Sequence, residues 1–140
     1  MKRPAGTGSG VLAIALAKIL RKPVLATDID PVAVRVAAAN AALNRVGHLV
    51  RAETAAGVRH PAIRGRAPFD LVVANILAEP LVRLAPQLAP LIAPGGTLVL
   101  SGLLPPQRER VVAAYGGQGI RLRGARIFAG WVVLLLQRPG

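Results

Sequence analysis

Apolar and polar residues alternate along the chain with the periods of helices and strands. From Val11 to Leu20 the apolar residues recur at helical spacing and stop before a proline, which predicts a helix. Residues 23–27 form a short apolar run that ends in a turn, which predicts a buried strand. Asp30 and Pro31 then suit the N-cap and first position of a second helix, which is predicted to end near Asn44.

The rest of the chain continues this alternation. It predicts a weak strand over 48–52, a loop over 54–68, strands over 69–76 and 97–101, helices over 78–93 and 106–115, a turn at 94–96, and strands over 120–127 and 131–137. Strands alternating with helices predict an α/β domain whose mostly parallel sheet is covered on both faces. The last two strands are separated by so few residues that they must pair as an antiparallel hairpin. This ending excludes a plain doubly wound nucleotide fold and favours a Rossmann-like methyltransferase sheet.

Length and composition narrow the class of protein. The 140 residues are 53% hydrophobic, which predicts one packed domain over residues 1–140. The absence of cysteine excludes disulfides and thiolate metal sites and favours a reduced, cytoplasmic setting. Because no apolar stretch approaches the roughly 20 residues that span a bilayer, no membrane association is expected.

The formal net charge of +12 is the feature that most suggests an acidic partner or RNA. However, the arginines are scattered singly, with no basic run and no interleaved aromatic residues. A solvated, arginine-rich surface explains this pattern better, so no direct contact with nucleic acid is expected.

A glycine-rich loop precedes the first predicted helix. Gly6, Gly8 and Gly10 allow positive φ and let a ligand approach bare backbone, beside the unpaired N–H groups of the helix. The loop lacks the Lys-Ser/Thr ending of a P-loop, which argues against a nucleoside triphosphatase. A tight turn with Thr7 or Ser9 as helix cap explains the loop equally well.

An acidic residue at the end of the next strand favours ligand binding. Asp28 lies where open α/β sheets bind ligands, and its carboxylate could accept hydrogen bonds from both hydroxyls of a ribose. Ile29 would form an apolar wall for a purine, whereas Asp30 is better explained as a helix cap. Both aspartates could be turn and cap residues only, but the loop and the acid together favour nucleoside binding.

Asn75 lies at the carboxyl end of the strongest predicted strand (69–76), at the same sheet edge as Asp28. Its amide offers one acceptor and two donors to an amine substrate or a cofactor, although such an asparagine is often only a helix cap. His48 and His60 have no third ligand nearby, so a metal site is not expected.

Together these motifs resemble a known family. The segments are GTGSGVLAIA (6–15), ATDIDPVAV (26–34), FDLVVANILAEPLVRLAP (69–86) and IAPGGTLVLSGLL (92–104). They are similar to the catalytic domain of class I S-adenosylmethionine-dependent methyltransferases. The NILA and LSGLL segments and the terminal GWVVLLLQRPG more narrowly resemble the bacterial methyltransferases of ribosomal protein L11, a large-subunit protein.

The resemblance implies methyl transfer from S-adenosylmethionine to lysine ε-amines and an N-terminal α-amine. It implies that the loop from Gly6 to Gly10, with Thr7, contacts the methionine portion of the cofactor. Asp28 and Ile29 would bind its adenosine portion. Asn75 would lie between cofactor and substrate amine, as the catalytic residue.

The start of the chain departs from the family pattern. A substrate-recruiting domain has no counterpart here, and Met1 to Ala5 stands where the first, central strand is expected. Pro4 is unsuited to a central strand. We therefore expect a gap in the sheet with unpaired inner edges, a marginally stable or aggregation-prone chain, and weak cofactor affinity. An RNA methyltransferase, or an inactive remnant or binding module of this fold, remain alternatives.

Overall fold

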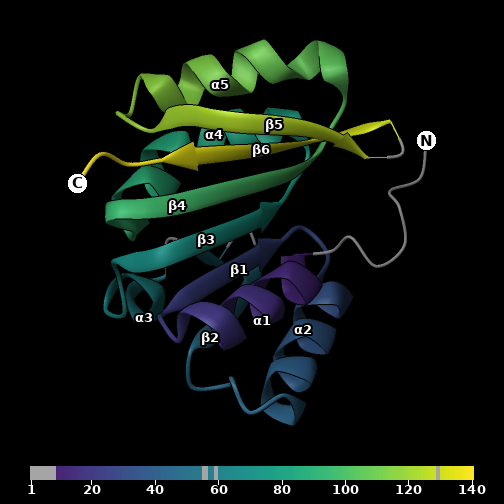
Figure 1. The fold of residues 1–140 in the computed structure, drawn as a ribbon, viewed down its shortest axis with the longest axis vertical. Coiled ribbons are helices and arrows are strands. Elements are labelled where there is room, and N and C mark those ends of the chain that lie inside the picture. The colour runs from purple at the N-terminus through teal and green to yellow at the C-terminus, as the bar shows by residue number, and fades with distance from the viewer. Residues whose placement is uncertain (1–8, 55–56, 59, 129) are drawn as a thin grey trace.

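The computed structural model describes residues 9–54, 57–58, 60–128 and 130–140, which form a six-stranded sheet with helices on both faces (Figure 1). In chain order the elements are α1 (Ser9–Leu20), β1 (Val24–Asp28), α2 (Pro31–Leu43), β2 (Val50–Thr54), α3 (Pro61–Arg64), β3 (Phe69–Asn75), α4 (Ala78–Leu88), η2 (Ala89–Leu91), β4 (Ile92–Leu103), η3 (Pro105–Gln107), α5 (Arg108–Gly116), β5 (Arg121–Phe128) and β6 (Trp131–Gln137). None of the helices described is long and apolar enough to cross a membrane.

The predicted sheet architecture is confirmed. The strand order is β2-β1-β3-β4-β6-β5, with parallel pairing from β2 to β4 and antiparallel pairing of β6 with both β4 and β5. The last two strands form the predicted hairpin. The fold is therefore a mostly parallel α/β sheet with one antiparallel edge.

The predicted gap in the sheet is wrong. Strand β1 pairs directly with β3 along its whole length, from Val24 opposite Leu71 to Asp28 opposite Asn75. Every residue of β1 is buried, so unpaired N–H and C=O groups along its inner edge would be costly. Direct pairing satisfies these groups, which removes the physical reason for expecting a marginally stable chain. The Met1 to Ala5 segment lies outside the described residues.

Several predicted boundaries shift because of contacts distant in sequence. Residues 94–96, predicted as a turn, belong to β4 because they continue its pairing beyond β6. Gly95 donates its N–H to the Arg138 carbonyl, and Arg138 donates to the Gly96 carbonyl, at 2.9 and 3.0 Å. The predicted weak strand lies two residues later, as β2, and the predicted loop contains the short helix α3.

The N-terminus of α2 forms as predicted. The Asp30 side chain accepts a hydrogen bond from the Val32 N–H at 2.9 Å, and Pro31 occupies the first helical position. This arrangement satisfies one otherwise unpaired N–H group and sets the direction of the chain as it leaves β1.

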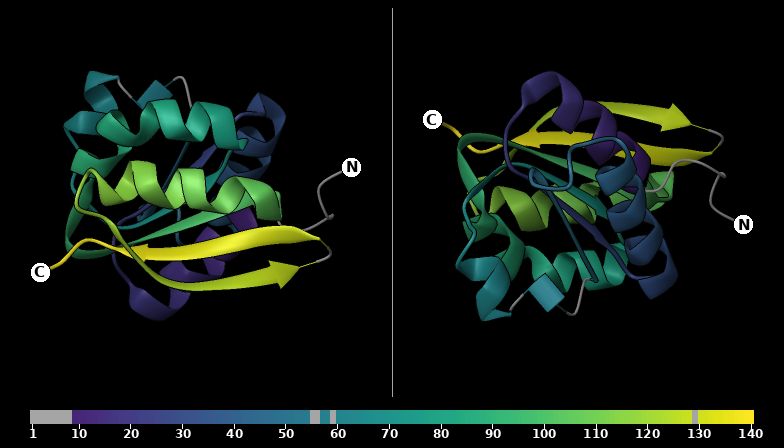
Figure 2. Two further views of the ribbon diagram at one scale, coloured as in Figure 1. Left: turned by 90° about the horizontal axis from the view of Figure 1, so that it is seen from above. Right: turned by 90° about the horizontal axis from the view of Figure 1, so that it is seen from below.

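Two apolar clusters lie on opposite faces of the sheet. The larger packs α4 and α5 against β3, β4, β6 and β5, whereas the smaller packs α1 and α2 mainly against β1, β2 and β3. Figure 2 shows α1 on the side of the strands opposite α4 and α5.

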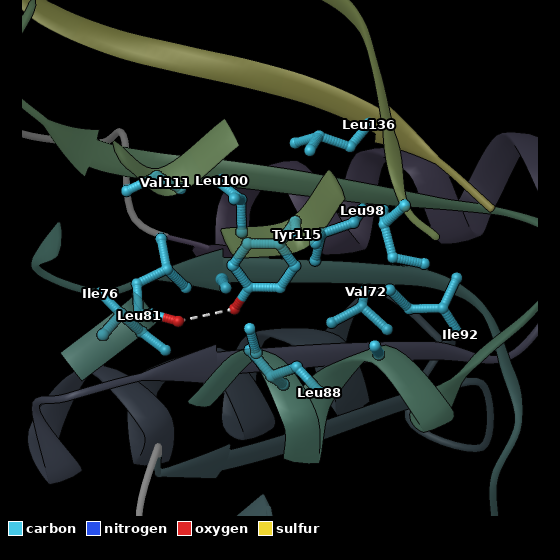
Figure 3. Packing of buried hydrophobic residues seen from close by; sticks show 14 of the residues in the cluster. Val72, Ile76, Leu81, Leu88, Ile92, Leu98, Leu100, Val111, Tyr115 and Leu136 are labelled. Carbon is cyan, nitrogen blue, oxygen red and sulfur yellow. Dashed lines mark hydrogen bonds between the residues drawn. The ribbon is translucent and has the colours of Figure 1, made fainter. Parts of the chain in front are cut away.

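Tyr115 lies in the larger cluster. Its ring is surrounded by aliphatic side chains, and its hydroxyl donates a hydrogen bond to the Leu81 carbonyl of α4 at 2.9 Å (Figure 3). Burial raises the pKa of the Tyr115 phenol well above its usual value of 10. This bond joins α5 to α4 and keeps a buried hydroxyl satisfied.

Candidate functional site

Four parallel strands place polar side chains side by side near one edge of the sheet. The strand register sets Asp28 of β1 opposite Asn75 of β3, and Asn75 opposite Ser101 of β4. On the other side of β1, Thr54 of β2 is opposite Asp28. Because ligands of open α/β sheets bind at the carboxyl ends of strands, this row is the candidate site.

Asp28 is the acidic centre of the row. It is 3% exposed, and Asn75 on the neighbouring strand is also buried. One carboxylate oxygen, Oδ1, accepts the N–H of Asp30 at 2.9 Å. The other, Oδ2, accepts the side-chain amide of Asn75 at 2.9 Å. These charge-assisted hydrogen bonds stabilise a carboxylate that would otherwise be costly to bury.

Asn75 connects Asp28 to the next strand. Its side-chain nitrogen donates to Asp28, and its side-chain oxygen accepts the Ser101 hydroxyl at 3.2 Å. The residue is 7% exposed, so these contacts hold its amide in one orientation. The role of a simple helix cap does not apply, because Leu77 is the N-cap of α4.

Ser101 is a site residue that was not predicted from the sequence, because a single serine near a strand end matches no distinctive motif. Its position near the carboxyl end of a predicted strand is the sequence feature that could have identified Ser101, and in the structure it is in register with Asn75. Gly102 follows with φ of +91°, and a Cβ built on it would lie 3.2 Å from the Asn75 side-chain oxygen. Glycine at this position therefore permits both the positive φ within β4 and the close approach to Asn75.

The other predicted site residues are only partly placed. Ile29 follows Asp28 and is 38% exposed, so its side chain is available as an apolar wall. Gly10 lies in the first turn of α1. Gly6, Thr7 and Gly8 lie outside the described residues.

The side chains of Asp28 and Ile29 suit a nucleoside, but Asp28 is already hydrogen-bonded to Asn75. A carboxylate beside an exposed apolar residue can accept ribose hydroxyls and flank a base. Here, however, the Asp28 carboxylate is buried and its Oδ2 already accepts the Asn75 amide, so a ribose hydroxyl would share or displace that bond. Among the described residues, no group of three acidic or histidine side chains could hold a metal ion.

Comparison with known proteins identifies the family. A family model described as "Ribosomal protein L11 methyltransferase (PrmA)" matches residues 4–139. The chain belongs to the ribosomal protein L11 methyltransferase family.

Individual family members match the chain closely. It is 60% identical over 132 residues to the ribosomal protein L11 methyltransferase of Mesorhizobium japonicum and 54% identical over 133 residues to that of a Chelativorans species. These matches cover 94% and 95% of this chain but 46% of each relative, so the chain spans less than half the length of these curated relatives.

A solved structure supports the same assignment. The ribosomal protein L11 methylase of Lactobacillus delbrueckii subsp. bulgaricus superimposes with a TM-score of 0.71 at 34% identity. The superposition covers 96% of this chain and 67% of the other. The predicted resemblance and the Rossmann-like methyltransferase fold are thus confirmed.

Proposed function

We propose that this chain is the cofactor-binding, catalytic part of an S-adenosylmethionine-dependent enzyme that methylates amino groups of ribosomal protein L11. The proposed acceptors are lysine ε-amines and the N-terminal α-amine of this large-subunit protein, in the cytoplasm and without direct contact to nucleic acid. Residues 1–140 would act as one domain. The observation that carries the proposal is the meeting of Asp28 and Asn75 at the carboxyl ends of adjacent parallel strands.

Each site residue predicted from the sequence has a proposed task. Asp28 would accept the ribose hydroxyls, and Ile29 would pack against the purine. Gly6, Thr7, Gly8 and Gly10 would contact the methionine portion. Asn75 would orient the substrate amine. When bound, the cofactor supplies an electrophilic methyl group, so holding a deprotonated amine in line with it would provide most of the rate enhancement.

The hydrogen bond between Asp28 and Asn75 affects the affinity expected for S-adenosylmethionine. Ribose hydroxyls at Asp28 would compete with the 2.9 Å hydrogen bond from Asn75 to a buried charge, and complete displacement of that bond sets the upper limit of the cost. Hydrogen bonds to charged groups are worth roughly 1.5–3 kcal/mol, which would weaken binding by about 10- to 150-fold. Weak cofactor affinity therefore remains our expectation, now for a different reason than a missing strand.

The proposed cofactor site is tested by titration calorimetry with S-adenosylhomocysteine. Asp28→Asn should weaken binding by about tenfold or more, because it removes the charged acceptor. Asp70→Asn is a matched control, since Asp70 is the second residue of β3 and lies at the opposite end of that strand. Equal affinity in the wild type and the Asp28 variant would contradict the assignment, and micromolar wild-type binding would contradict the expected weakness.

The closed Asp28–Asn75 contact also favours one alternative, an inactive remnant or binding module of the same fold. Transfer of a radiolabelled methyl group from S-adenosylmethionine to purified ribosomal protein L11 separates the two functions. Incorporation that is lost in Asn75→Ala supports the enzyme. Absence of both incorporation and cofactor crosslinking supports the binding module.

A further inference from the structure

The backbone of β4 is irregular near its carboxyl end. Two residues of β4, Ser101 and Gly102, lie opposite the single residue of β6 between Leu134 and Val132. This two-against-one count is a β-bulge, which redirects a side chain and is over-represented next to active sites. Here the bulge lies within the candidate site, because Ser101 is in register with Asn75.

The polar side chains of Asp28, Asn75 and Ser101 share one face of the sheet. The residues two positions earlier on the same three strands all belong to the smaller apolar cluster: Ala26, Val73 and Val99. Because side chains two positions apart on a strand point to the same face, the three polar residues extend this cluster toward the edge. Ser101 is half-buried, whereas Asp28 and Asn75 are 3% and 7% exposed, so Ser101 is the most accessible of the three.

The direction of the hydrogen bonds determines what Ser101 can offer a ligand. The Asp28 carboxylate only accepts, so the Asn75 atom that faces it is the amide nitrogen, 2.9 Å from Oδ2. The Asn75 side-chain oxygen therefore faces Ser101, and since that oxygen also only accepts, the Ser101 hydroxyl must donate, at 3.2 Å. No donor to the Ser101 oxygen is found among the described residues. Ser101 thus offers its lone pairs to a ligand and has no hydrogen left to donate.

This series of hydrogen bonds ends on a negative charge. It runs from the Ser101 hydroxyl through the Asn75 amide to the Asp28 carboxylate, and hydrogen bonds in series polarise one another. The polarisation increases the electron density on the Ser101 oxygen, which favours a donor that carries positive charge. An alkylammonium N–H is such a donor, whereas a ribose hydroxyl is neutral.

We propose that the Ser101 side-chain oxygen accepts a hydrogen bond from the amino group that is methylated, and so holds its nitrogen at this edge of the sheet. This role rests on the proposed function, which supplies the amine, and it adds a second contact to the one proposed for Asn75. A deprotonated primary amine has two N–H groups and one lone pair. Holding one N–H at Ser101 leaves the lone pair free and restricts its direction, which is the positioning that methyl transfer requires.

Two small ligands of equal charge test the hydrogen bond without methyl transfer. n-Butylamine represents a lysine side chain and carries N–H groups, whereas butyltrimethylammonium has the same charge at neutral pH and no N–H group. Binding of each to the 140-residue chain is followed by NMR through the backbone amides of Ser101 and Gly102. n-Butylamine should bind about fivefold or more tightly than butyltrimethylammonium, and Ser101→Ala should remove this preference. A preference caused only by ligand size would persist in the variant.

Two further variants separate the Ser101 hydroxyl from the fold around it. Ser101→Thr keeps a hydroxyl and should bind n-butylamine within about threefold of the wild type. Thr97→Val removes a hydroxyl from a half-buried residue of the same strand, about 13 Å away, and should bind as the wild type does. Urea titration of each variant checks that it is folded under the assay conditions.

Methyl transfer to ribosomal protein L11 supplies a second readout. Ser101→Ala should lower kcat by about tenfold, because the amine loses one of its two contacts. Its affinity for S-adenosylhomocysteine should stay within about twofold of the wild type, since Ser101 contacts the amine and not the cofactor. A loss of that affinity without loss of n-butylamine binding would place Ser101 in the cofactor site and overturn its proposed role.

The outcomes distinguish the role of Ser101 from the proposed function. Binding of n-butylamine that depends on Ser101, without methyl transfer by the wild type, would contradict the proposed function alone. Methyl transfer that Ser101→Ala leaves unchanged would overturn the role of Ser101 alone. Equal behaviour of the two ligands with the wild type, or equal loss of binding in Ser101→Ala and either Ser101→Thr or Thr97→Val, would also overturn it.

Discussion

Replacing Asn75 by alanine tests the direct pairing of β1 with β3, which distinguishes this chain from the expected arrangement with a gap. The substitution removes the 2.9 Å donor to the buried Asp28 carboxylate and the acceptor of the Ser101 hydroxyl. A hydrogen bond to a charged group contributes roughly 1.5–3 kcal/mol and a neutral one about 1 kcal/mol. We therefore expect Asn75→Ala to lower the free energy of unfolding by about 2.5–4 kcal/mol in urea titrations.

A double-mutant cycle with Asp28→Asn makes the test specific. If the two side chains are bonded as described, the cycle should give a coupling energy of about 1–2 kcal/mol. If another strand lay between β1 and β3, Asp28 and Asn75 would be separated by two strand spacings, about 10 Å, and should couple by less than about 0.5 kcal/mol. Ser101→Ala, which removes only the 3.2 Å bond, is the control and should cost about 1 kcal/mol. A coupling near zero would refute the direct pairing.

Three further predictions concern other parts of the fold. Tyr115→Phe should lower the free energy of unfolding by about 0.5–1.5 kcal/mol in thermal unfolding, because it removes the hydrogen bond to Leu81. Because burial raises the pKa of Tyr115, raising the pH beyond about 10 should destabilise the wild type through this residue but leave the variant without that effect. Gly102→Ala should cost about 1–3 kcal/mol in urea unfolding, since φ is +91° there, and a neutral result would contradict that backbone conformation. Arg110→Ala should raise the pKa of the Glu79 carboxyl toward 4.5 in an NMR titration, because its hydrogen bond to Arg110 lowers that pKa; an unchanged titration would exclude the ion pair in solution.

Local signals in the sequence predicted most individual elements correctly. The cap of α2 depends on Asp30 and its near neighbours, so the sequence contains all the information it needs. The apolar run from Phe69 to Asn75 similarly predicts β3, because its length and branching suit a buried strand. Elements that depend on distant partners were misplaced. The Pro94 to Gly96 segment is a turn by local rules and becomes strand because Arg138 pairs with it.

The residues of the candidate site could be predicted from the sequence, but the contacts between them could not. Asp28 and Asn75 could be selected from the sequence because each lies at the carboxyl end of a predicted strand, and parallel strands end at the same edge. Their contact with each other, and the bond from Ser101 to Asn75, could not be predicted. Both depend on which strands are neighbours, and strand order is a property of the whole sheet.

The sequence alone therefore determined the elements, the parallel sheet with its terminal hairpin, and the polar residues at the strand ends, because these follow from local periodicity, caps and turns. Tertiary structure alone decided that β1 and β3 close directly on each other, which buries Asp28 against Asn75. It also decided that α5 packs against α4, where the Tyr115 hydroxyl donates to the Leu81 carbonyl. Both outcomes arise because backbone groups and apolar surface must find partners across the chain, and local sequence does not encode which partners are present.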